Sequence, residues 1–166
     1  MTPAELPAYL RRLAAQVKGQ AAVDAADAMA QAYQGAVVRS MRGPSPSAPG
    51  TPPARRTGTL ARSVRAEPAR LTAPGRAESS VAPHTVYARI QQLGGDIYPV
   101  RAKVLRWKVG RQYRYARHVH LPARPYMVVT DAIRRECRAA AADAVQRVIL
   151  SQPQVDHTPE GPPWMS

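Results

Sequence analysis

Residues 86–127 carry the sequence VYARIQQLGGDIYPVRAKVLRWKVGRQYRYARHVHLPARPYM, which decides the fold predicted for this chain. The first part of this stretch predicts a short helix, because Val86, Ile90 and Leu93 are spaced to share one helical face. The glycine pair Gly94-Gly95 follows directly and can end that helix, since glycine adopts positive φ without steric cost. The rest of the stretch is predicted to be extended chain.

The middle of the stretch has the alternation of a β-hairpin. The two alternating runs are Leu105–Val109 and Tyr113–Leu121, joined by the three residues Gly110-Arg111-Gln112. Because successive side chains along a strand point to opposite faces, we expect apolar groups on one face and arginines on the other. The aromatic residues Trp107, Tyr113 and Tyr115 are then expected to pack in the core, with base stacking on single strands as the alternative.

Every charged side chain between Ile97 and Pro125 is basic. The cations predicted to contact nucleic acid or to face a channel are Arg101, Lys103, Arg106, Lys108, Arg111 and Arg114. Phosphate contacts from such residues would be independent of base sequence and strongly sensitive to salt. Neither a recognition-helix nor a zinc-finger pattern is present, so the sequence does not indicate a sequence-specific reader.

Helices are predicted on both sides of this stretch. The first is expected over residues 7–41, where apolar residues and alanines recur every three or four positions. The last is expected from about Pro125 or Tyr126 to Leu150, after the prolines of the 122–125 segment have stopped the strand. Its expected buried stripe consists of Val129, Ile133, Cys137, Ala140, Ala144 and Val148.

A loop, a short helix and another hairpin are predicted before Val86. Residues 43–56 are rich in proline, glycine and serine and predict a flexible loop, either a plain surface insertion or one that orders on meeting a ring neighbour or DNA. Thr57 is expected to cap a short helix, because its hydroxyl can accept from a backbone donor two or three residues on. Residues 65–71 and 77–82 flank a Pro74-Gly75 turn, which predicts a hairpin.

These elements predict an α+β fold in a single domain. The expected order is a long N-terminal helix, a short helix, an antiparallel sheet of two hairpins, and a long C-terminal helix packed on the sheet. The domain spans residues 1–150, and residues 151–166, with four prolines, are predicted to form a flexible C-terminal tail. Trp164 in this tail either docks on a partner or lies in a disordered terminus.

The charge of the chain favours an anionic partner. Its 166 residues carry a formal net charge of +13, and the sequence pI is near 11.0. Nucleic acid, anionic lipid and an acidic protein are the candidate partners, whereas a high-GC genome would explain the arginines without any partner. No apolar run approaches the roughly 18 to 20 residues that cross a bilayer, and no signal sequence is apparent, so we expect synthesis and use in the cytoplasm.

Three short motifs occur in a fixed order along the chain. They are Thr57-Gly58-Thr59-Leu60, then Tyr87-Ala88 leading to Gly94-Gly95, and then Ala123-Arg124-Pro125-Tyr126 before the last helix. This order resembles the virion morphogenesis or tail-completion family of tailed bacteriophages, whose members work at the joint between capsid and tail. The resemblance covers roughly residues 57–150 and does not extend to the Pro-rich insertion or the tail.

The resemblance implies a structural virion protein of the neck or tail, made in the cytoplasm of a host bacterium and without a membrane partner. Such a protein would form a ring, such as a hexamer, around the channel for packaged double-stranded DNA. It would complete or cap the tail and contact the phage head connector and the tail tube or terminator proteins. The residues expected to contact another subunit or partner are Arg55, Arg56, Arg124, Tyr126 and Trp164. The alternative is a freestanding, sequence-independent nucleic-acid-binding protein that uses the basic hairpin.

The sequence predicts neither an enzyme nor a cofactor or metal site. Acidic residues are few and scattered, so no pair of carboxylates is evident for acid–base chemistry or for holding magnesium. His118 and His120 share one face of a strand, but zinc needs further ligands, and the other interpretation is two neutral polar histidines. The only cysteine, Cys137, excludes an intrachain disulfide and is expected to be a small packing residue.

Overall fold

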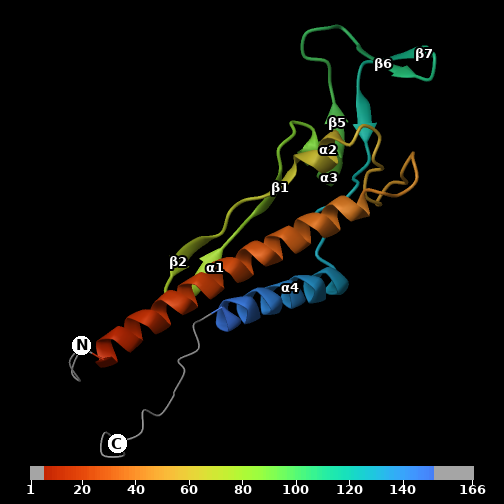
Figure 1. Cartoon of the computed structure of the whole chain (residues 1–166). Helices are drawn as coiled ribbons and strands as arrows, with labels where there is room; N and C mark the ends of the chain where they lie inside the picture. The colour runs from red at the N-terminus through yellow and green to blue at the C-terminus, as the bar shows by residue number, and fades with distance from the viewer. Residues whose placement is uncertain (1–5, 152–166) are drawn as a thin grey trace, which may run out of the picture.

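The computed structural model describes residues 6–151 and confirms the predicted α+β class. Figure 1 shows an elongated molecule in which α1 forms the axis, with strands along one side and α4 along the other. The helices are α1 (Leu6–Ser40), α2 (Thr59–Ser63), α3 (Ala88–Leu93) and α4 (Asp131–Leu150). The strands are β1 (Val64–Ala66), β2 (Arg70–Ala73), β3 (Arg76–Glu78), β4 (Val81–Pro83), β5 (Gly95–Ile97), β6 (Leu105–Val109), β7 (Gln112–Ala116) and β8 (Val119–Leu121).

The two long helices pack on each other. Three residues of its predicted stripe, Cys137, Ala144 and Val148, are the buried residues of α4, whereas Val129 precedes the helix and is exposed, against the prediction. The Nη2 group of Arg39 on α1 donates to both carboxylate oxygens of Glu136. The predicted packing of this helix on the sheet is corrected, because its main partner is α1. Small side chains on both helices permit this close approach.

The last helix begins at Asp131, later than the predicted start at Pro125 or Tyr126. Thr130 is its N-cap, and the Thr130 side chain accepts from the Ile133 backbone N–H at 3.3 Å. Before it, the side-chain oxygen of Gln92 accepts from the backbone N–H groups of Tyr126 and Met127 at 2.9 and 3.0 Å. These bonds hold the two residues against α3, so the helix starts only after them.

Both predicted hairpins are present, and each consists of two antiparallel ladders in succession. In the first, β1 pairs with β4, and β2 pairs with β3 closer to the turn at Pro74-Gly75. In the second, β5 pairs with β8 and β6 pairs with β7 closer to the turn at Gly110-Arg111. The four ladders are separate two-stranded sheets, so the described residues contain no sheet that joins the two hairpins.

The core is small and lies where the end of α1 meets α2 and β1. Its buried cluster contains Val37, Met41, Ala61, Val64 and Tyr126. The Tyr126 side chain is only 2% exposed, and its hydroxyl donates to the Ala88 carbonyl oxygen at 3.3 Å. The core therefore joins the end of α1 to the start of α3 and to the segment that precedes α4.

The Pro-rich loop, residues 43–56, folds back on this end of the molecule. The backbone N–H of Gly50 donates to the Ala123 carbonyl oxygen, and that of Arg55 donates to the Met41 carbonyl oxygen, both at 2.9 Å. The loop was predicted to be flexible, and in the structure these two hydrogen bonds give it a defined path across residues 122–124.

Gly94 ends α3 as predicted and makes a close backbone approach. Its φ is +72°, and a Cβ atom at this position would lie 2.6 Å from the Ala123 nitrogen and 2.9 Å from the Leu121 oxygen. Only glycine avoids both the strained φ and this overlap. Gly94 thus allows the root of the second hairpin to lie directly against the segment that leads to α4.

Candidate functional site

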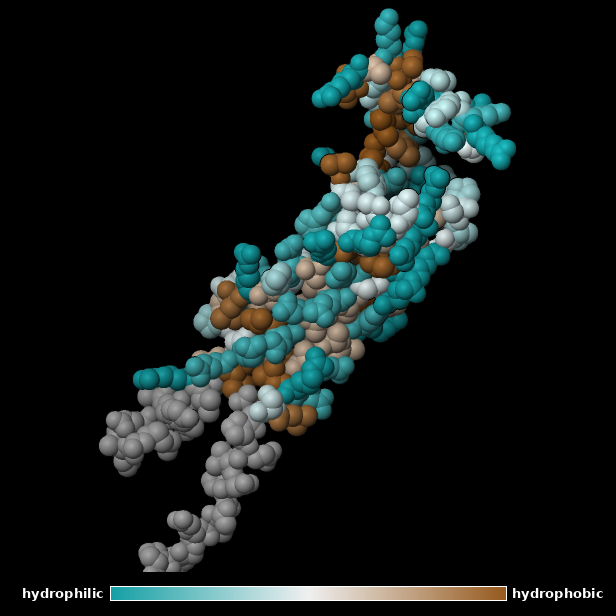
Figure 2. Space-filling model, turned by 45° about the horizontal axis from the view of Figure 1, so that its top comes forward, coloured by the Kyte–Doolittle hydropathy of each residue, from teal (hydrophilic) through white to brown (hydrophobic). Residues whose placement is uncertain are grey.

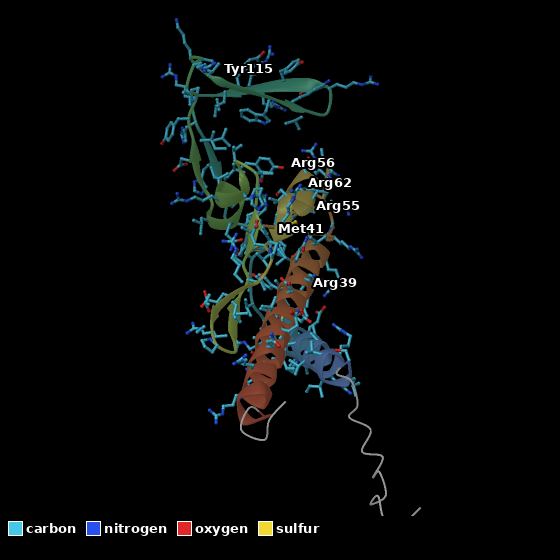
Figure 3. The ribbon with its side chains drawn as sticks, turned by 60° about the vertical axis from the view of Figure 1, so that its left-hand side comes forward. Arg39, Met41, Arg55, Arg56, Arg62 and Tyr115 are labelled. Atoms are coloured by element: carbon cyan, nitrogen blue, oxygen red, sulfur yellow. The ribbon has the colours of Figure 1, made fainter. Side chains whose placement is uncertain are left out.

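Residues 98–118 form an arm that extends from the ladder of β5 and β8. Figure 1 shows the β6–β7 hairpin beyond the end of α1, away from both long helices. Every residue from Arg106 to Tyr115 is exposed, so this part of the arm does not rest on the core. In Figure 3 the side chains of the hairpin, including labelled Tyr115, radiate into open space.

The arm brings together all six cations that were predicted to contact nucleic acid or a channel. Arg101 and Lys103 lie in the segment before β6, and the hairpin carries the other four, which are Arg106, Lys108, Arg111 and Arg114. Arg117 adds a seventh. All seven are exposed, and none forms an ion pair within residues 6–151. Because the arm contains no acidic residue, its positive field is not neutralised locally.

Cations and aromatic rings share both faces of the hairpin, which corrects the predicted apolar and basic faces. Trp107 lies opposite Arg114, while Arg106 lies opposite Tyr115 and Lys108 opposite Tyr113. Directly opposed residues in an antiparallel pair occupy the same face. The Arg106 guanidinium also lies over the ring of Tyr113, 4.9 Å from its centroid, as a cation–π contact.

The length of the turn explains this correction. A connection of three residues would pair Val109 with residue 113 and place Trp107 opposite Tyr115. The structure instead pairs Val109 with Gln112 across the two-residue turn Gly110-Arg111, where Gly110 has φ of +61°. A positive φ at the first central residue is what a type II′ turn requires. The shift of one residue moves every side chain of β7 to the other face.

The aromatic residues of the hairpin are exposed, although they were expected in the core. Trp107 is 39% exposed, Tyr113 53% and Tyr115 61%, and Val100 and Val109 are exposed as well. Figure 2 shows hydrophobic and hydrophilic residues intermixed over the end of the molecule that carries the arm. Exposed apolar groups that gather on a surface are typical of sites that contact another molecule.

The two histidines that raised the question of a metal site lie at the root of the arm. His120 on β8 is paired with Asp96 on β5, its Nδ1 atom 3.0 Å from the carboxylate oxygen. The ring of His118 stacks on that of Tyr98 with centroids 5.8 Å apart. Among residues 6–151, no three His, Cys, Asp or Glu side chains come together as metal ligands would.

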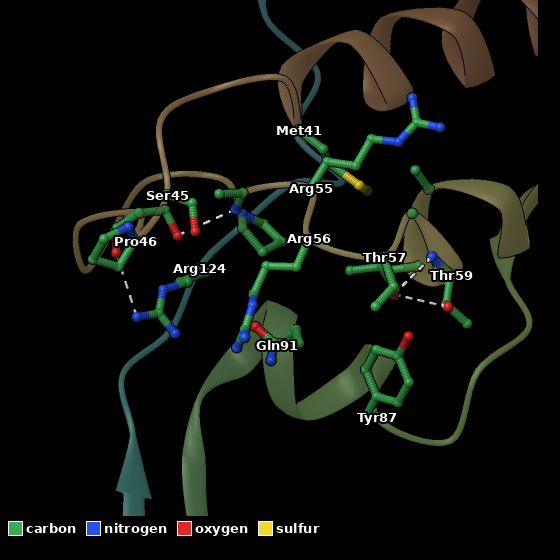
Figure 4. A pocket seen from close by; sticks show the side chains of 16 residues that line it. Met41, Ser45, Pro46, Arg55, Arg56, Thr57, Thr59, Tyr87, Gln91 and Arg124 are labelled. Carbon is green, nitrogen blue, oxygen red and sulfur yellow. Dashed lines mark hydrogen bonds between the residues drawn. The ribbon is translucent and has the colours of Figure 1, made fainter. Parts of the chain in front are cut away.

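The other candidate site is a cavity beneath the Pro-rich loop. The cavity has a volume of about 540 Å³, and Figure 4 shows it between this loop, α2, α3 and the segment around Arg124. Three of the predicted contact residues, Arg55, Arg56 and Arg124, line it. In Figure 4 Arg56 reaches toward Gln91, and Arg124 approaches from the side of Pro46. We call this cavity the arginine pocket.

The neighbouring motif residue Thr57 also lines this pocket. Its hydroxyl accepts from the Thr59 backbone N–H at 3.4 Å, the predicted two residues on. The N-cap of α2 is Gly58, however, with φ of +78°. The motif therefore places a left-handed glycine at the start of the helix, with the threonine immediately before it.

The other two predicted contact residues have different outcomes. Tyr126 lies in the core instead of on a surface that a partner could reach, because its ring is needed to fill the space beside Val37 and Met41. Trp164 lies outside the described residues. Sequence reasoning missed Gln92, whose amide joins α3 to residues 126 and 127, since a lone glutamine carries no pattern that distinguishes it from a surface residue.

The pKa shifts concern buried groups away from the arm. Burial raises the pKa of Tyr126 and of Tyr33. It also raises the pKa of the Cys137 thiol, and the adjacent Glu136 carboxylate raises it further.

In the described part of the chain no helix combines the length and apolar character that would span a bilayer.

Comparison with known proteins identifies no relative of this chain. No family model matches it, and no curated protein or solved structure does so either. The resemblance to phage tail-completion proteins consequently depends on three short motifs and their order.

Proposed function

We propose that the chain is a structural protein of the head–tail joint of a tailed bacteriophage. It forms a ring that completes or caps the tail and connects it to the capsid connector, with its arms directed at the DNA in the channel. The motif order supports the family, and the α+β fold is the one that the resemblance implies. The observation that carries the proposal is the arm, whose seven exposed cations have no acidic partner within residues 6–151.

The chemistry of the arm suits DNA that moves past it. Every sequence of the genome traverses the neck of a virion, so contacts in the channel must ignore base sequence. Arginine and lysine contacts to phosphate meet this condition, because they fix position without reading bases. Exposed cations on both faces of the hairpin, such as Arg106 and Arg114, allow phosphate contact from either side.

The same arm supports assembly with neighbours. A two-stranded hairpin is marginally stable by itself in water, and this one exposes Trp107, Tyr113 and Tyr115. The core of the chain is also small for its length. A ring in which neighbouring subunits cover these aromatic residues would bury them and stabilise the hairpin.

Replacing Arg106, Lys108 and Arg114 with Gln tests the DNA contact. The purified variant should fold normally, because these side chains are exposed, but bind duplex DNA more weakly by fluorescence anisotropy. If all three meet phosphates, the slope of log affinity against log salt should fall in magnitude by about 3. The control replaces Arg135, Arg138 and Arg147, three exposed arginines of α4, with Gln. Equal losses in both triple variants, or no loss in the first, would contradict a specific role of the arm.

Assembly separates this proposal from the alternative of a freestanding nucleic-acid-binding protein, which the same basic arm favours. The head–tail role predicts rings in light scattering and negative-stain images, either of the protein alone or after addition of connector or tail proteins. The alternative predicts a monomer that binds DNA and ignores those proteins. A persistent monomer in the presence of both would refute the head–tail role.

A further inference from the structure

The arginine pocket has a cationic lining without an acidic counterpart. Arg55, Arg56 and Arg124 line it, and none of the sixteen lining residues is Asp or Glu. None of these three arginines forms an ion pair within the described part of the chain. The pocket therefore presents unpaired guanidinium groups, which match the two oxygens of a carboxylate or the oxygens of a phosphate.

Arg124 is fixed in place with one donor unused. Its backbone N–H donates to the Gln91 carbonyl oxygen at 2.9 Å, and its Nη2 group lies 3.4 Å from the Ser47 carbonyl oxygen. The Nε atom is buried and has no hydrogen-bond partner among residues 6–151. Because a buried donor without an acceptor is unfavourable, an acceptor oxygen supplied from outside the described residues would stabilise this side chain.

The remaining walls favour a peptide over a nucleic acid. Met41, Pro46, Pro53 and Leu60 contribute apolar surface beside the arginines. The volume of about 540 Å³ lies in the range of pockets that hold a small ligand or a few side chains. A duplex is far too wide to enter such a cavity, whereas a carboxylate side chain with an apolar neighbour fits both kinds of wall.

The C-terminal segment of the chain offers carboxylates with apolar neighbours. Residues 152–166, which lie outside the described part, carry Asp156 and Glu160 and contain no lysine or arginine. They are acidic in a chain whose net charge is +13. Apolar residues stand directly beside the carboxylates, with Val155 before Asp156 and Pro159 before Glu160.

Chain geometry points to a neighbouring copy as the source of this segment. Glu136 contacts Arg39, close to Met41 in the pocket wall, and Figure 1 shows α4 running from there toward the N-terminal half of α1. At 1.5 Å per residue, Leu150 lies roughly 21 Å farther along the molecule. Five fully extended residues beyond Ser151 span at most about 18 Å, too little for Asp156 to reach the pocket of its own chain, whereas the nine residues to Glu160 span up to about 32 Å. Simultaneous contact of both carboxylates with one pocket therefore requires the segment of a neighbouring copy.

We propose that the arginine pocket of one copy binds the acidic segment 152–166 of another copy through the carboxylates of Asp156 and Glu160. Because the pocket and the segment are different surfaces, the contact is head-to-tail, the kind that closes into a ring when the rotation between copies permits it. This inference goes beyond the proposed role in the phage neck and does not depend on it, since the pocket and the segment can bind each other whether or not the chain works there.

Binding of a labelled peptide tests the proposal. A fluorescent peptide of residues 152–166 is titrated with the full-length D156N/E160Q variant, whose own segment cannot compete. We expect saturable binding in anisotropy, and at least a tenfold loss for a peptide that carries the same Asn and Gln replacements. Adding Arg56→Gln to the protein should weaken binding of the unmodified peptide at least tenfold. Arg56 is a suitable site because its side chain is exposed and forms no hydrogen bond with any described residue, and Arg135→Gln on α4 is the matched control.

Competition and self-association complete the test. Duplex DNA should not displace the peptide, and 10 mM inorganic phosphate should do so only weakly. The wild-type chain should also form larger species than D156N/E160Q by sedimentation velocity, with circular dichroism confirming that both are folded. Absence of peptide binding, equal loss with Arg56→Gln and Arg135→Gln, or complete displacement by DNA would each overturn the proposal. The first two of these outcomes leave the separate test of DNA binding by the arm unaffected.

Discussion

Replacing Gly94 with Ala should destabilise the protein more than any other glycine-to-alanine change at a loop position. The φ of +72° is strained for alanine and by itself costs about 1 to 3 kcal/mol. The new Cβ atom would also lie 2.6 Å from the Ala123 nitrogen, a backbone atom that cannot move aside without shifting residues 121–123. Together the two effects should lower the free energy of unfolding by roughly 3 to 5 kcal/mol, because a backbone overlap is added to the strain.

Two other glycines separate the causes. Gly95 also has a positive φ, +143°, but its added Cβ would meet nothing closer than Ile90 at 3.8 Å, so Gly95→Ala reports the strain without the overlap. Gly43 has open space around it, and Gly43→Ala should be nearly neutral. Urea unfolding gives the free energies, and a loss of 3 to 5 kcal/mol corresponds to a fall in Tm of about 6 to 20 °C. If Gly94→Ala and Gly95→Ala are equally stable, the close approach to Ala123 is not what the structure indicates.

Two further predictions concern the Cys137 thiol and the Gln92 amide. Because burial and the nearby Glu136 carboxylate raise the pKa of Cys137, less of its thiol is ionised at pH 8 than in the unfolded chain. Native protein should therefore react with a thiol reagent at about one tenth of the rate of protein in urea, or more slowly still. Equal rates would contradict the burial of Cys137. Gln92→Leu should lower the free energy of unfolding by about 1 to 3 kcal/mol, because the N–H groups of Tyr126 and Met127 lose their acceptor. Gln92→Glu, which keeps the acceptor, should be closer to wild type in the same urea titration.

Local patterns were sufficient for the helices, the hairpins and the basic arm. The arm could be predicted because its cations are close together in the sequence, so that any extended fold of residues 98–118 would gather them. The glycines that end α3 were predictable for a similar reason, since their effect on the backbone is local. Neither prediction depends on contacts with residues elsewhere in the chain.

Two kinds of feature were not predictable, which are the register of the second hairpin and the contacts that depend on distant residues. The face of each residue on β7 depends on whether the turn has two or three residues, and the sequence Gly110-Arg111-Gln112 permits both. The late start of α4 depends on Gln92, far away along the chain. The arginine pocket likewise requires Arg55, Gln91 and Arg124 to come together from three separate segments.

Because of the two-residue turn at Gly110-Arg111, neither face of the hairpin is purely apolar or purely basic. An amphipathic hairpin packs its apolar face on a partner and leaves its polar face in water. Here either side offers an aromatic ring next to a cation, as Trp107 with Arg114 and Tyr115 with Arg106 show. One arm inserted between two molecules could thus hold both with the same chemistry, acting as a double-sided wedge.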